Sequence, residues 1–314
     1  MVLSSRSLPY ARLALRSLFA NCVEDFHISL ITDSCDDAVR LSNELDQMRD
    51  IAWNAKRTAS VHSRSDLDEL AQDRMSKFFH IQEFRRGHPC WLKITDPILL
   101  SGDGDEMIVL DPDIVFPNRF RFEPTADTGV FLMWQRPSCL LPAEVVEKAI
   151  SSKIPLAHHT DIGVAQWRLP ADLDWLDWLM GTLGSSQLPR SMHVESIVWA
   201  ALAMRIGGGH LNPKRWVCWH RTQYKRVLIK LGTQGASILK SEPFAEMKCF
   251  HAGGEAKWWL ESAHASGMLD RGYDLTAPSD FIPYDEFTPA EFQFLQKRRH
   301  ALRKLGYYSL FRSS

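Results

Sequence analysis

Apolar and polar positions along the chain alternate with two different periods, about 3.6 residues in helices and two residues in strands. Four segments carry apolar residues at helical spacing, as expected for helices that bury one face. They are residues 9–21, 67–84, 91–100 and 193–206, and the last of them stops at Gly207.

Five shorter segments are mostly apolar, which is typical of buried strands. They are residues 26–31, 107–110, 128–134, 162–167 and 247–250. Because these strands alternate with the helical segments, the pattern predicts an α/β protein with a mostly parallel central sheet flanked by helices. Only Met1–Ser5 precede the first helix, so the opening strand is either short or begins upstream of this sequence.

The sequence contains neither internal repeats nor a low-complexity linker, which favours one catalytic domain with a C-terminal appendage. We place the domain at residues 1–270 and a helical, basic appendage at residues 271–314. A net charge of −1 argues against a globally basic nucleic-acid binder.

The cysteines and the hydropathy point to a soluble, cytoplasmic protein. The six cysteines are scattered and lack zinc-binding spacing, which favours reduced thiols over disulfides. No apolar run approaches the length of a membrane span, and the N-terminus has no signal-peptide core.

Candidate chemistry lies where the strand at 107–110 ends, because Asp111 and Asp113 follow it directly. Ligands of open α/β sheets bind at the carboxyl ends of strands. Two carboxylates packed together raise each other's pKa unless a counter-charge is present, and Mg²⁺ or Mn²⁺ is a suitable one that also binds phosphate oxygens. Three further Asp-x-Asp pairs, at 66/68, 103/105 and 172/174, lie in polar or helix-like surroundings that are typical of solvated surface.

Several motifs occur in the order found in one enzyme family. They read "ALRSLFAN", "LITDS", "WLKITDPILL…DEMIVLDPDIVF", "HTDIGVAQW", "HVESIVWAA" and "CFHAGGEAKWW". Over roughly residues 8–260 the chain therefore resembles glycosyltransferases with the Rossmann-like GT-A fold, particularly family 8. The resemblance implies transfer of a sugar from a nucleotide sugar, with a UDP-sugar favoured, to a hydroxyl group of a glycan, a cell-surface polysaccharide or a lipid-linked precursor.

The resemblance also assigns candidate site residues. As metal ligands for Mn²⁺ or Mg²⁺ it implies Asp111, Asp113 and His251. As nucleotide-sugar-binding residues it implies Asp33, Lys93, Asp111 and Gly163, and as catalytic carboxylates Glu195 and Asp161. The chemistry of a diphosphate adds Lys257, as a second positive charge, and Gly253 and Gly254, which would let the backbone approach the phosphates closely. Two positions depart from the family pattern: Asp161 and Gly163 stand where Asn-x-Gly is frequent, and Glu195-Ser196 stands where Asp-Gln is usual.

Simpler interpretations remain open for four of these positions. Asp33 also fits a helix N-cap, and Lys93 an exposed helical lysine. His193 fits a structural histidine, and the turn that begins at His251 occurs by chance in many chains.

Two other function classes remain open. A metal-dependent phosphohydrolase or nucleotidyltransferase would also use strand-end carboxylates, but a hydrolase usually needs a second metal. A nucleotidyltransferase usually has a basic, glycine-rich loop after its first strand, which Ser4–Ser7 do not resemble. The other class is a non-catalytic sugar-binding protein that has kept the fold.

The C-terminal segment is basic and aromatic. From Thr288 the pattern predicts a helix, and after Glu291 it contains Lys297, Arg298, Arg299, Arg303, Lys304 and Arg312 with no acidic residue. Leu305, Tyr307, Tyr308, Leu310 and Phe311 accompany them. We favour a helix packed on the body with a solvated basic face; the alternative is peripheral contact with the anionic inner face of a membrane.

Overall fold

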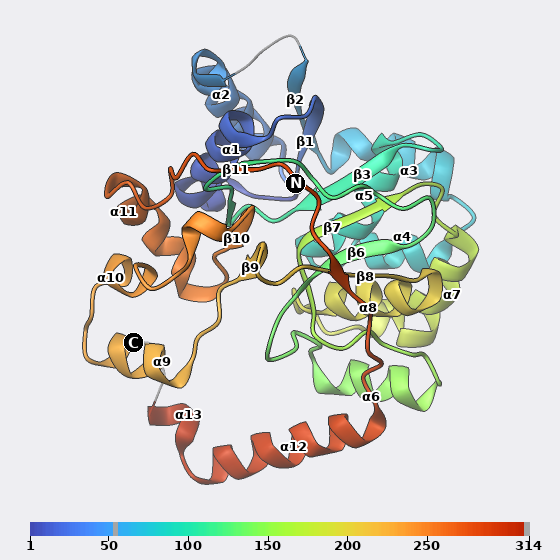
Figure 1. The fold of residues 1–314 in the computed structure, drawn as a ribbon. Helices are drawn as coiled ribbons and strands as arrows, with labels where there is room; N and C mark the ends of the chain where they lie inside the picture. The colour runs from blue at the N-terminus through green and yellow to red at the C-terminus, as the bar shows by residue number, and fades with distance from the viewer. Residues whose placement is uncertain (53–55, 311–314) are drawn as a thin grey trace.

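The computed structural model describes residues 1–52 and 56–310, which form a mixed α/β fold (Figure 1). Its centre is a five-stranded sheet in the order β12-β8-β6-β7-β3. These strands are Phe281–Ile282, Gly208–Leu211, Val130–Trp134, Thr160–Arg168 and Glu106–Leu110, respectively. The predicted strands at 107–110, 128–134 and 162–167 are thereby confirmed.

The central sheet is not mostly parallel, so that part of the prediction is wrong. Only β6 and β8 run parallel, whereas β3 and β6 both pair antiparallel with β7, and β12 pairs antiparallel with β8. The cause lies between β6 and β7. Although the helix α6 (Ala143–Ser151) separates them, β7 begins beside the end of β6, where Trp134 pairs with Thr160. A helix between two strands therefore does not ensure a parallel crossover.

Three smaller sheets complete the framework. β1 (Phe26–Thr32) and β2 (Arg57–Ser63) pair in parallel. β10 (Cys249–His251) lies between β4 (Ile114–Val115) and β9 (Trp216–Cys218), and β11 (Asp274–Leu275) pairs with β5 (Arg119–Phe120). A short opening strand is present as a parallel bridge between Val2 and Ile31.

The helices include three predicted ones. α1 (Leu8–Asn21), α5 (Leu92–Leu100) and α8 (Val194–Ile206) confirm the predicted segments, and α8 ends at Gly207 with a positive φ of 78°. The segment 67–84 is instead divided into α3 (Asp68–Met75) and α4 (Phe79–Arg85). The remaining helices are α2 (Cys35–Ala52), α7 (Leu173–Leu183), α9 (Gln223–Lys230), α10 (Gly235–Leu239), α11 (Leu260–Ala265), α12 (Pro289–Lys304) and α13 (Tyr307–Leu310).

Three apolar clusters fill the interior. The largest packs β3, β6 and β7 against helices α3 to α8. The second lies on the opposite face of the same strands, against α1 and α2, and the third joins α10 and α11 to α1 and β10. Each face of the central strands is thus covered, which explains why their sequences read as continuous apolar runs.

A buried ion pair links distant parts of the chain. Lys248 Nζ lies 2.8 Å from Glu123 Oε1, and both side chains are almost completely buried. Glu123 also accepts hydrogen bonds from Trp216 Nε1 at 2.8 Å and from the backbone N–H of Ser279 at 2.8 Å. Burial raises the pKa of Glu123, but these partners outweigh it and hold the pKa below the usual glutamate value.

The residues after 270 return to the body before the last long helix. β11 and β12 join two of the sheets, and Phe287 is buried. α12 then begins with a capping box between Thr288 and Glu291. It runs along the lower edge of the molecule from near α6 towards α9 (Figure 1). The division of the chain at residue 270 stays a prediction.

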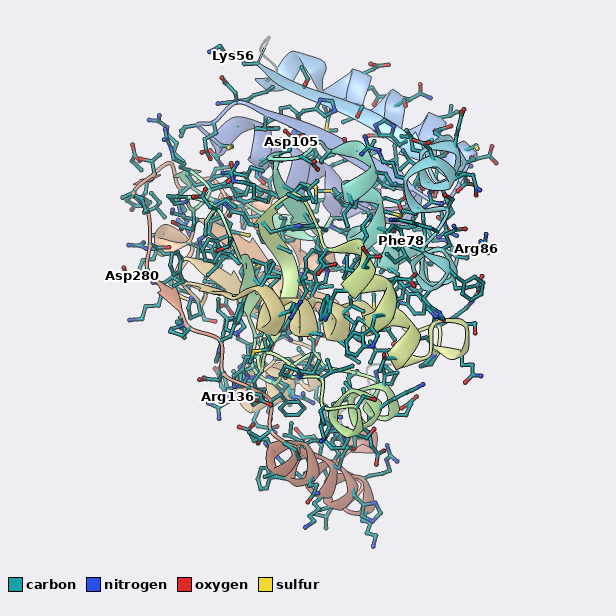
Figure 2. The ribbon with its side chains drawn as sticks, turned by 90° about the vertical axis from the view of Figure 1, so that its right-hand side faces the viewer. Lys56, Phe78, Arg86, Asp105, Arg136 and Asp280 are labelled. Carbon is teal, nitrogen blue, oxygen red and sulfur yellow. The ribbon has the colours of Figure 1, made fainter. Side chains whose placement is uncertain are left out.

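The predicted C-terminal helix is confirmed as α12, and it packs only lightly on the body. It has no buried residue, although Phe292 and Leu295 touch the largest apolar cluster. Figure 2 shows its side chains extending from the end of the molecule. No helix in the described part of the chain combines the length and the hydropathy of a membrane span. Phe311 and Arg312 lie outside the described residues.

Candidate metal and donor site

Strand pairing brings the two aspartates and the late histidine together. Asp111 follows β3, and its backbone N–H donates to the Gly163 carbonyl of β7 at 2.9 Å. Asp113 precedes β4, whose Ile114 pairs with His251 of β10. His251 Nε2 consequently lies 3.3 Å from Asp113 Oδ1 and 3.6 Å from Asp111 Oδ2. The sequence predicted that the histidine follows a strand at 247–250, whereas in the structure His251 is the last residue of the strand β10.

The opposite ring nitrogen of His251 is held by Asp161. His251 Nδ1 lies 2.8 Å from Asp161 Oδ1, which also accepts the Gly163 backbone N–H at 2.9 Å. When the ring is neutral, a proton on Nδ1 leaves the lone pair of Nε2 on the side of Asp111 and Asp113, where a metal ion could bind it. Carboxylate-bound histidines of this kind are typical of metal sites, where the carboxylate fixes the ring and its tautomer.

The three side chains fit a divalent cation. One ligand atom from each of Asp111, Asp113 and His251 lies within 4.8 Å of the other two. Asp113 and His251 are only 6% and 8% exposed, so little water reaches this group. The negative charges of Asp111 and Asp113 therefore repel each other unless a cation lies between them. Two oxygen ligands and one imidazole nitrogen could hold such an ion, and the donor set does not fix its identity.

Charges around this group shift its pKa values. Burial lowers the pKa of His251, but Asp161 and Asp113 outweigh it, so the pKa lies well above the usual histidine value. Burial raises the pKa of Asp161, yet the neighbouring His251 reverses the effect and lowers it to about 2. Asp161 is therefore a carboxylate at neutral pH and stays an acceptor for the ring.

Lys93 lies behind the aspartates and is buried, so the alternative of an exposed helical lysine is wrong. Its Nζ contacts Asp111 Oδ1 and lies 3.0 Å from Glu195 Oε1. Burial raises the pKa of Glu195 to about 8, although Lys93 opposes this. Glu195 Oε2 is buried without a hydrogen-bond partner among the described residues.

A cavity of about 620 Å³ opens beside the aspartates, a volume suited to a small-molecule ligand. Lys257 lines it, and its Nζ lies 3.5 Å from Asp113 Oδ2. Asp33 lines it too, while Ser34 Oγ accepts the backbone N–H of Asp37 at the start of α2. Ser34 therefore fills the capping role that was an alternative for Asp33.

Three glycines flank the histidine. Gly163 has no room for a side chain, because a Cβ there would stand 2.6 Å from His251 Nδ1. A Cβ on Gly253 would lie 3.9 Å from His251 Nε2, an ordinary contact. Gly254 has a φ of +64°, which disfavours residues with a side chain.

Gly163→Ala should loosen the site without unfolding the protein. The added methyl group would push the His251 ring away from Asp161 and so misdirect Nε2. By analogy with the loss of other groups that orient a metal ligand, we expect a metal affinity lower by about 10- to 100-fold. Calorimetric titration with Mn²⁺ measures this, and Gly253→Ala serves as the matched control. Unchanged affinity in Gly163→Ala would show that the ring does not depend on this contact.

Sequence reasoning did not single out Tyr10, Arg40 or Cys218. Tyr10 and Arg40 line the cavity, and Lys257 Nζ lies 5.2 Å from the centroid of the Tyr10 ring. Cys218 lies beside His251 on the neighbouring strand. Nothing in their local sequence marks these residues, since each is brought to the site by packing between distant elements. His193, at the start of α8, has a pKa lowered by burial; its role stays open.

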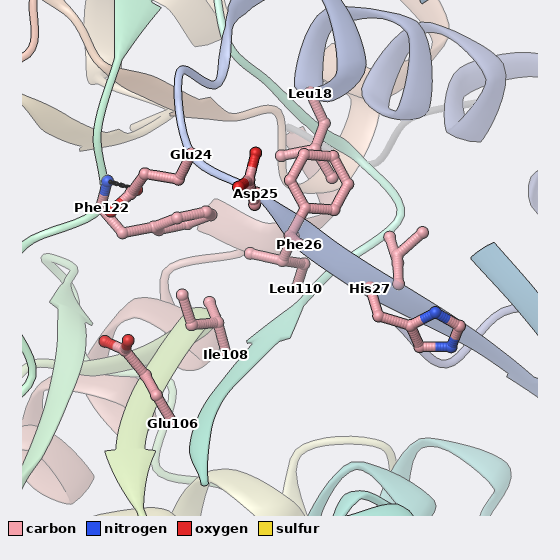
Figure 3. A pocket seen from close by; sticks show the side chains of 10 residues that line it. Leu18, Glu24, Asp25, Phe26, His27, Glu106, Ile108, Leu110 and Phe122 are labelled. Carbon is pink, nitrogen blue, oxygen red and sulfur yellow. Dashed lines mark hydrogen bonds between the residues drawn. The ribbon is translucent and has the colours of Figure 1, made fainter. Parts of the chain in front are cut away.

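A second cavity lies at the other end of β1 and β3 (Figure 3). It measures about 220 Å³, and its walls combine the carboxyl groups of Glu24, Asp25 and Glu106 with apolar side chains such as Phe26 and Phe122. It contains none of the predicted site residues.

Comparison with known proteins supports the fold. No model of a known protein family matches the chain, and no curated protein matches its sequence. Among solved structures, the chain is similar to the crystal structure of mouse xyloside xylosyltransferase 1 in its apo form, with a TM-score of 0.50 and 11% sequence identity. The similarity covers 80% of this chain and 94% of the mouse chain. The chain therefore has an α/β fold of the GT-A-like glycosyltransferase type.

Proposed function

We propose that this protein is a glycosyltransferase that moves a sugar from a nucleoside-diphosphate sugar, with a UDP-sugar favoured, to a hydroxyl acceptor. The observation that carries the proposal is the convergence of Asp111, Asp113 and His251 beside a cavity of about 620 Å³, within a fold shared with a xylosyltransferase. The acceptor we favour is a glycan, a cell-surface polysaccharide or a lipid-linked precursor in the cytoplasm.

We assign Asp111, Asp113 and His251 as ligands of Mn²⁺ or Mg²⁺. Carboxylates suit either ion, and the imidazole favours a transition metal, hence Mn²⁺. When bound, such an ion would stabilise the negative charge that develops on the departing nucleoside diphosphate. Lys93 would keep Asp111 in place, because its ammonium group contacts this carboxylate from the buried side.

The remaining candidate residues have roles that follow from their positions. Lys257 and Asp33 line the cavity. There the ammonium group of Lys257 can bind a phosphate, and the carboxylate of Asp33 can accept a hydrogen bond from a ribose hydroxyl. Gly253 and Gly254 let the backbone approach the phosphates closely. Gly163 supports the donor site by leaving room for the His251 ring.

Glu195 and Asp161 are the carboxylates that we place in the catalytic machinery. Glu195 Oε2 can form a hydrogen bond with a sugar hydroxyl, because it is buried without a protein partner in the described structure. Asp161 orients His251 through the 2.8 Å contact with Nδ1. Both residues are buried next to the metal site, Glu195 through its contact with Lys93 and Asp161 through its contact with His251.

The position of His251 favours a transferase over the alternatives. A phosphohydrolase with two metals would need two ions that both reach the bound phosphate. In residues 1–52 and 56–310 the only other cluster of suitable side chains adds Asp161 and Cys218 to His251, and neither of these lines the cavity. A sugar-binding protein without activity would bind the same ligands. Only a transferase would turn over a nucleotide sugar, so a measurement of turnover distinguishes the proposed enzyme from an inactive sugar-binding protein.

Binding of UDP should depend on the metal. Because Asp111, Asp113 and His251 would hold the ion beside the cavity, its positive charge would favour binding of the diphosphate. We therefore expect UDP and Mn²⁺ to strengthen each other's binding by about 1–3 kcal/mol, roughly 5- to 150-fold. Isothermal titration calorimetry with Mn²⁺ and with a chelator measures this coupling, and His251→Ala should reduce it. Equal affinity under both conditions would remove the metal from the proposal.

The C-terminal helix is a candidate for peripheral membrane contact. Phe294, Leu305 and Tyr308 are exposed, at 64%, 78% and 42% of their surface, among the basic residues of α12. If this surface binds anionic lipid, deletion of residues 291–314 should weaken binding to phosphatidylserine vesicles and leave hydrolysis of a soluble donor unchanged. Vesicle sedimentation measures the effect. Equal vesicle binding by both proteins, or no binding by the full chain, would favour a helix that only packs on the body and does not contact membrane.

A further inference from the structure

A thiol lies on the side of His251 that faces away from the proposed metal site. Cys218 ends β9, which pairs in parallel with β10 so that Cys218 stands directly beside His251. Its Sγ is 3.8 Å from His251 Nδ1, the nitrogen that also contacts Asp161 Oδ1 at 2.8 Å. One donor atom from each of the three residues lies within 4.8 Å of the other two.

We propose that Asp161, Cys218 and His251 form a second metal site, selective for Zn²⁺ or a similarly thiophilic ion, on the Nδ1 edge of the His251 ring. Its ligand set differs in kind from that formed by Asp111, Asp113 and Nε2. A thiolate is a soft ligand that prefers zinc to manganese or magnesium, whereas the two aspartates offer only hard oxygen atoms.

The geometry is close to what zinc requires. Zinc bonds of about 2.3 Å to sulfur and about 2.0–2.2 Å to nitrogen and oxygen place tetrahedral donors roughly 3.3–3.6 Å apart. The observed separation of 3.8 Å from sulfur to nitrogen is slightly longer than this range, and that of 2.8 Å from nitrogen to oxygen is about half an ångström shorter. Zinc binding would therefore require Asp161 and Cys218 to adjust their side chains.

Zinc binding would change the histidine as well as the thiol. Starting from a neutral ring, the ion takes the place of the thiol proton and of the proton on Nδ1, so two protons pass to solvent and the ring becomes an imidazolate. The hydrogen bond from Nδ1 to Asp161 is replaced by two metal bonds, and His251 is then shared between the two sites. Zinc should therefore perturb the Nε2 ligand and lower Mn²⁺-dependent turnover, a consequence that rests on the proposed function.

Cobalt and zinc titrations test the site on the full-length protein. Co²⁺ bound to a thiolate gives an intense near-ultraviolet charge-transfer band, which oxygen and nitrogen ligands alone do not give. We expect the band in the wild-type protein and in Cys139→Ser, and its loss in Cys218→Ser. Zn²⁺ affinity by calorimetry should fall about tenfold or more in Cys218→Ser alone, because a soft ligand is removed.

Cys139→Ser is the matched control because Cys139 is another thiol near the site, whose Sγ donates to Gln135 Oε1 at 3.2 Å. A wild-type protein without the cobalt band, or equal Zn²⁺ affinity in wild type and Cys218→Ser, overturns the proposal. The zinc-free Cys218→Ser protein should keep Mn²⁺-dependent UDP binding. Should wild type lack that binding but show the cobalt band, the glycosyltransferase proposal would fail while the zinc site stands.

Discussion

Replacing Asp113 by asparagine is expected to abolish turnover of a nucleotide sugar while the protein remains folded. The amide keeps the shape of the side chain but removes the charge that faces His251 Nε2 and Lys257 Nζ. A bound cation stabilises the transition state by several kcal/mol, so we expect kcat to fall by about 10³-fold or more when its binding is lost. Release of UDP from the donor, measured with and without acceptor, gives the result.

Asp103→Asn is the matched control for this variant. Asp103 belongs to another Asp-x-Asp pair, is exposed, and lies before β3 rather than after it. Its replacement removes the same charge and should leave kcat unchanged. The unfolding temperatures of both variants should stay close to that of the wild type. Full activity in Asp113→Asn would contradict the metal assignment, since no ligand charge would then be needed at this position.

Replacing Lys248 by methionine should cause the largest loss of stability. Methionine preserves much of the volume but leaves Glu123 as a buried carboxylate without its cation. Removing one partner of a buried ion pair typically costs about 3–5 kcal/mol in the free energy of unfolding. Urea denaturation at neutral pH measures the cost, and the exposed Lys240→Met serves as the control.

The stability of this variant should also respond differently to pH. In the wild type the pKa of Glu123 is lowered below the usual glutamate value of 4.5, so its stabilising contribution is present above that pH and is lost as the pH falls. Without Lys248, burial should raise the pKa, so the variant gains stability as the pH falls towards 4.5. The gap between the two proteins should narrow with acid. A constant gap would indicate that lost packing, rather than charge, causes the effect.

Much of the local structure could be predicted from the sequence, because a buried strand or a one-sided helix leaves a periodic trace. The strand before Asp111 and the helix from 193 to Gly207 are examples. Strand direction leaves no such trace. Whether β7 runs parallel or antiparallel to β6 depends on how residues 135–159 return, and apolar runs look the same in both cases.

The residues of the candidate site also fall into those that could be predicted from the sequence and those that could not. Asp111 and Asp113 could be located because a strand-end position is visible locally. The resemblance added His251, and Lys257 followed from its charge and its place in the same turn. The burial of Lys93 could not be foreseen, since it depends on Asp111 and on Glu195, which is 102 residues away. Cys218 was missed for the same reason: it reaches His251 through the pairing of β9 with β10.

The Glu123 cluster has a consequence for the order in which the protein can fold during synthesis. Its partners Lys248 and Ser279 follow it by 125 and 156 residues. The edge strand β12 is made equally late, so the central sheet and this carboxylate both wait for a segment close to the end of the chain. A nascent chain would carry Glu123 in solvent until then. The domain should therefore reach its native state only after most of the chain has emerged.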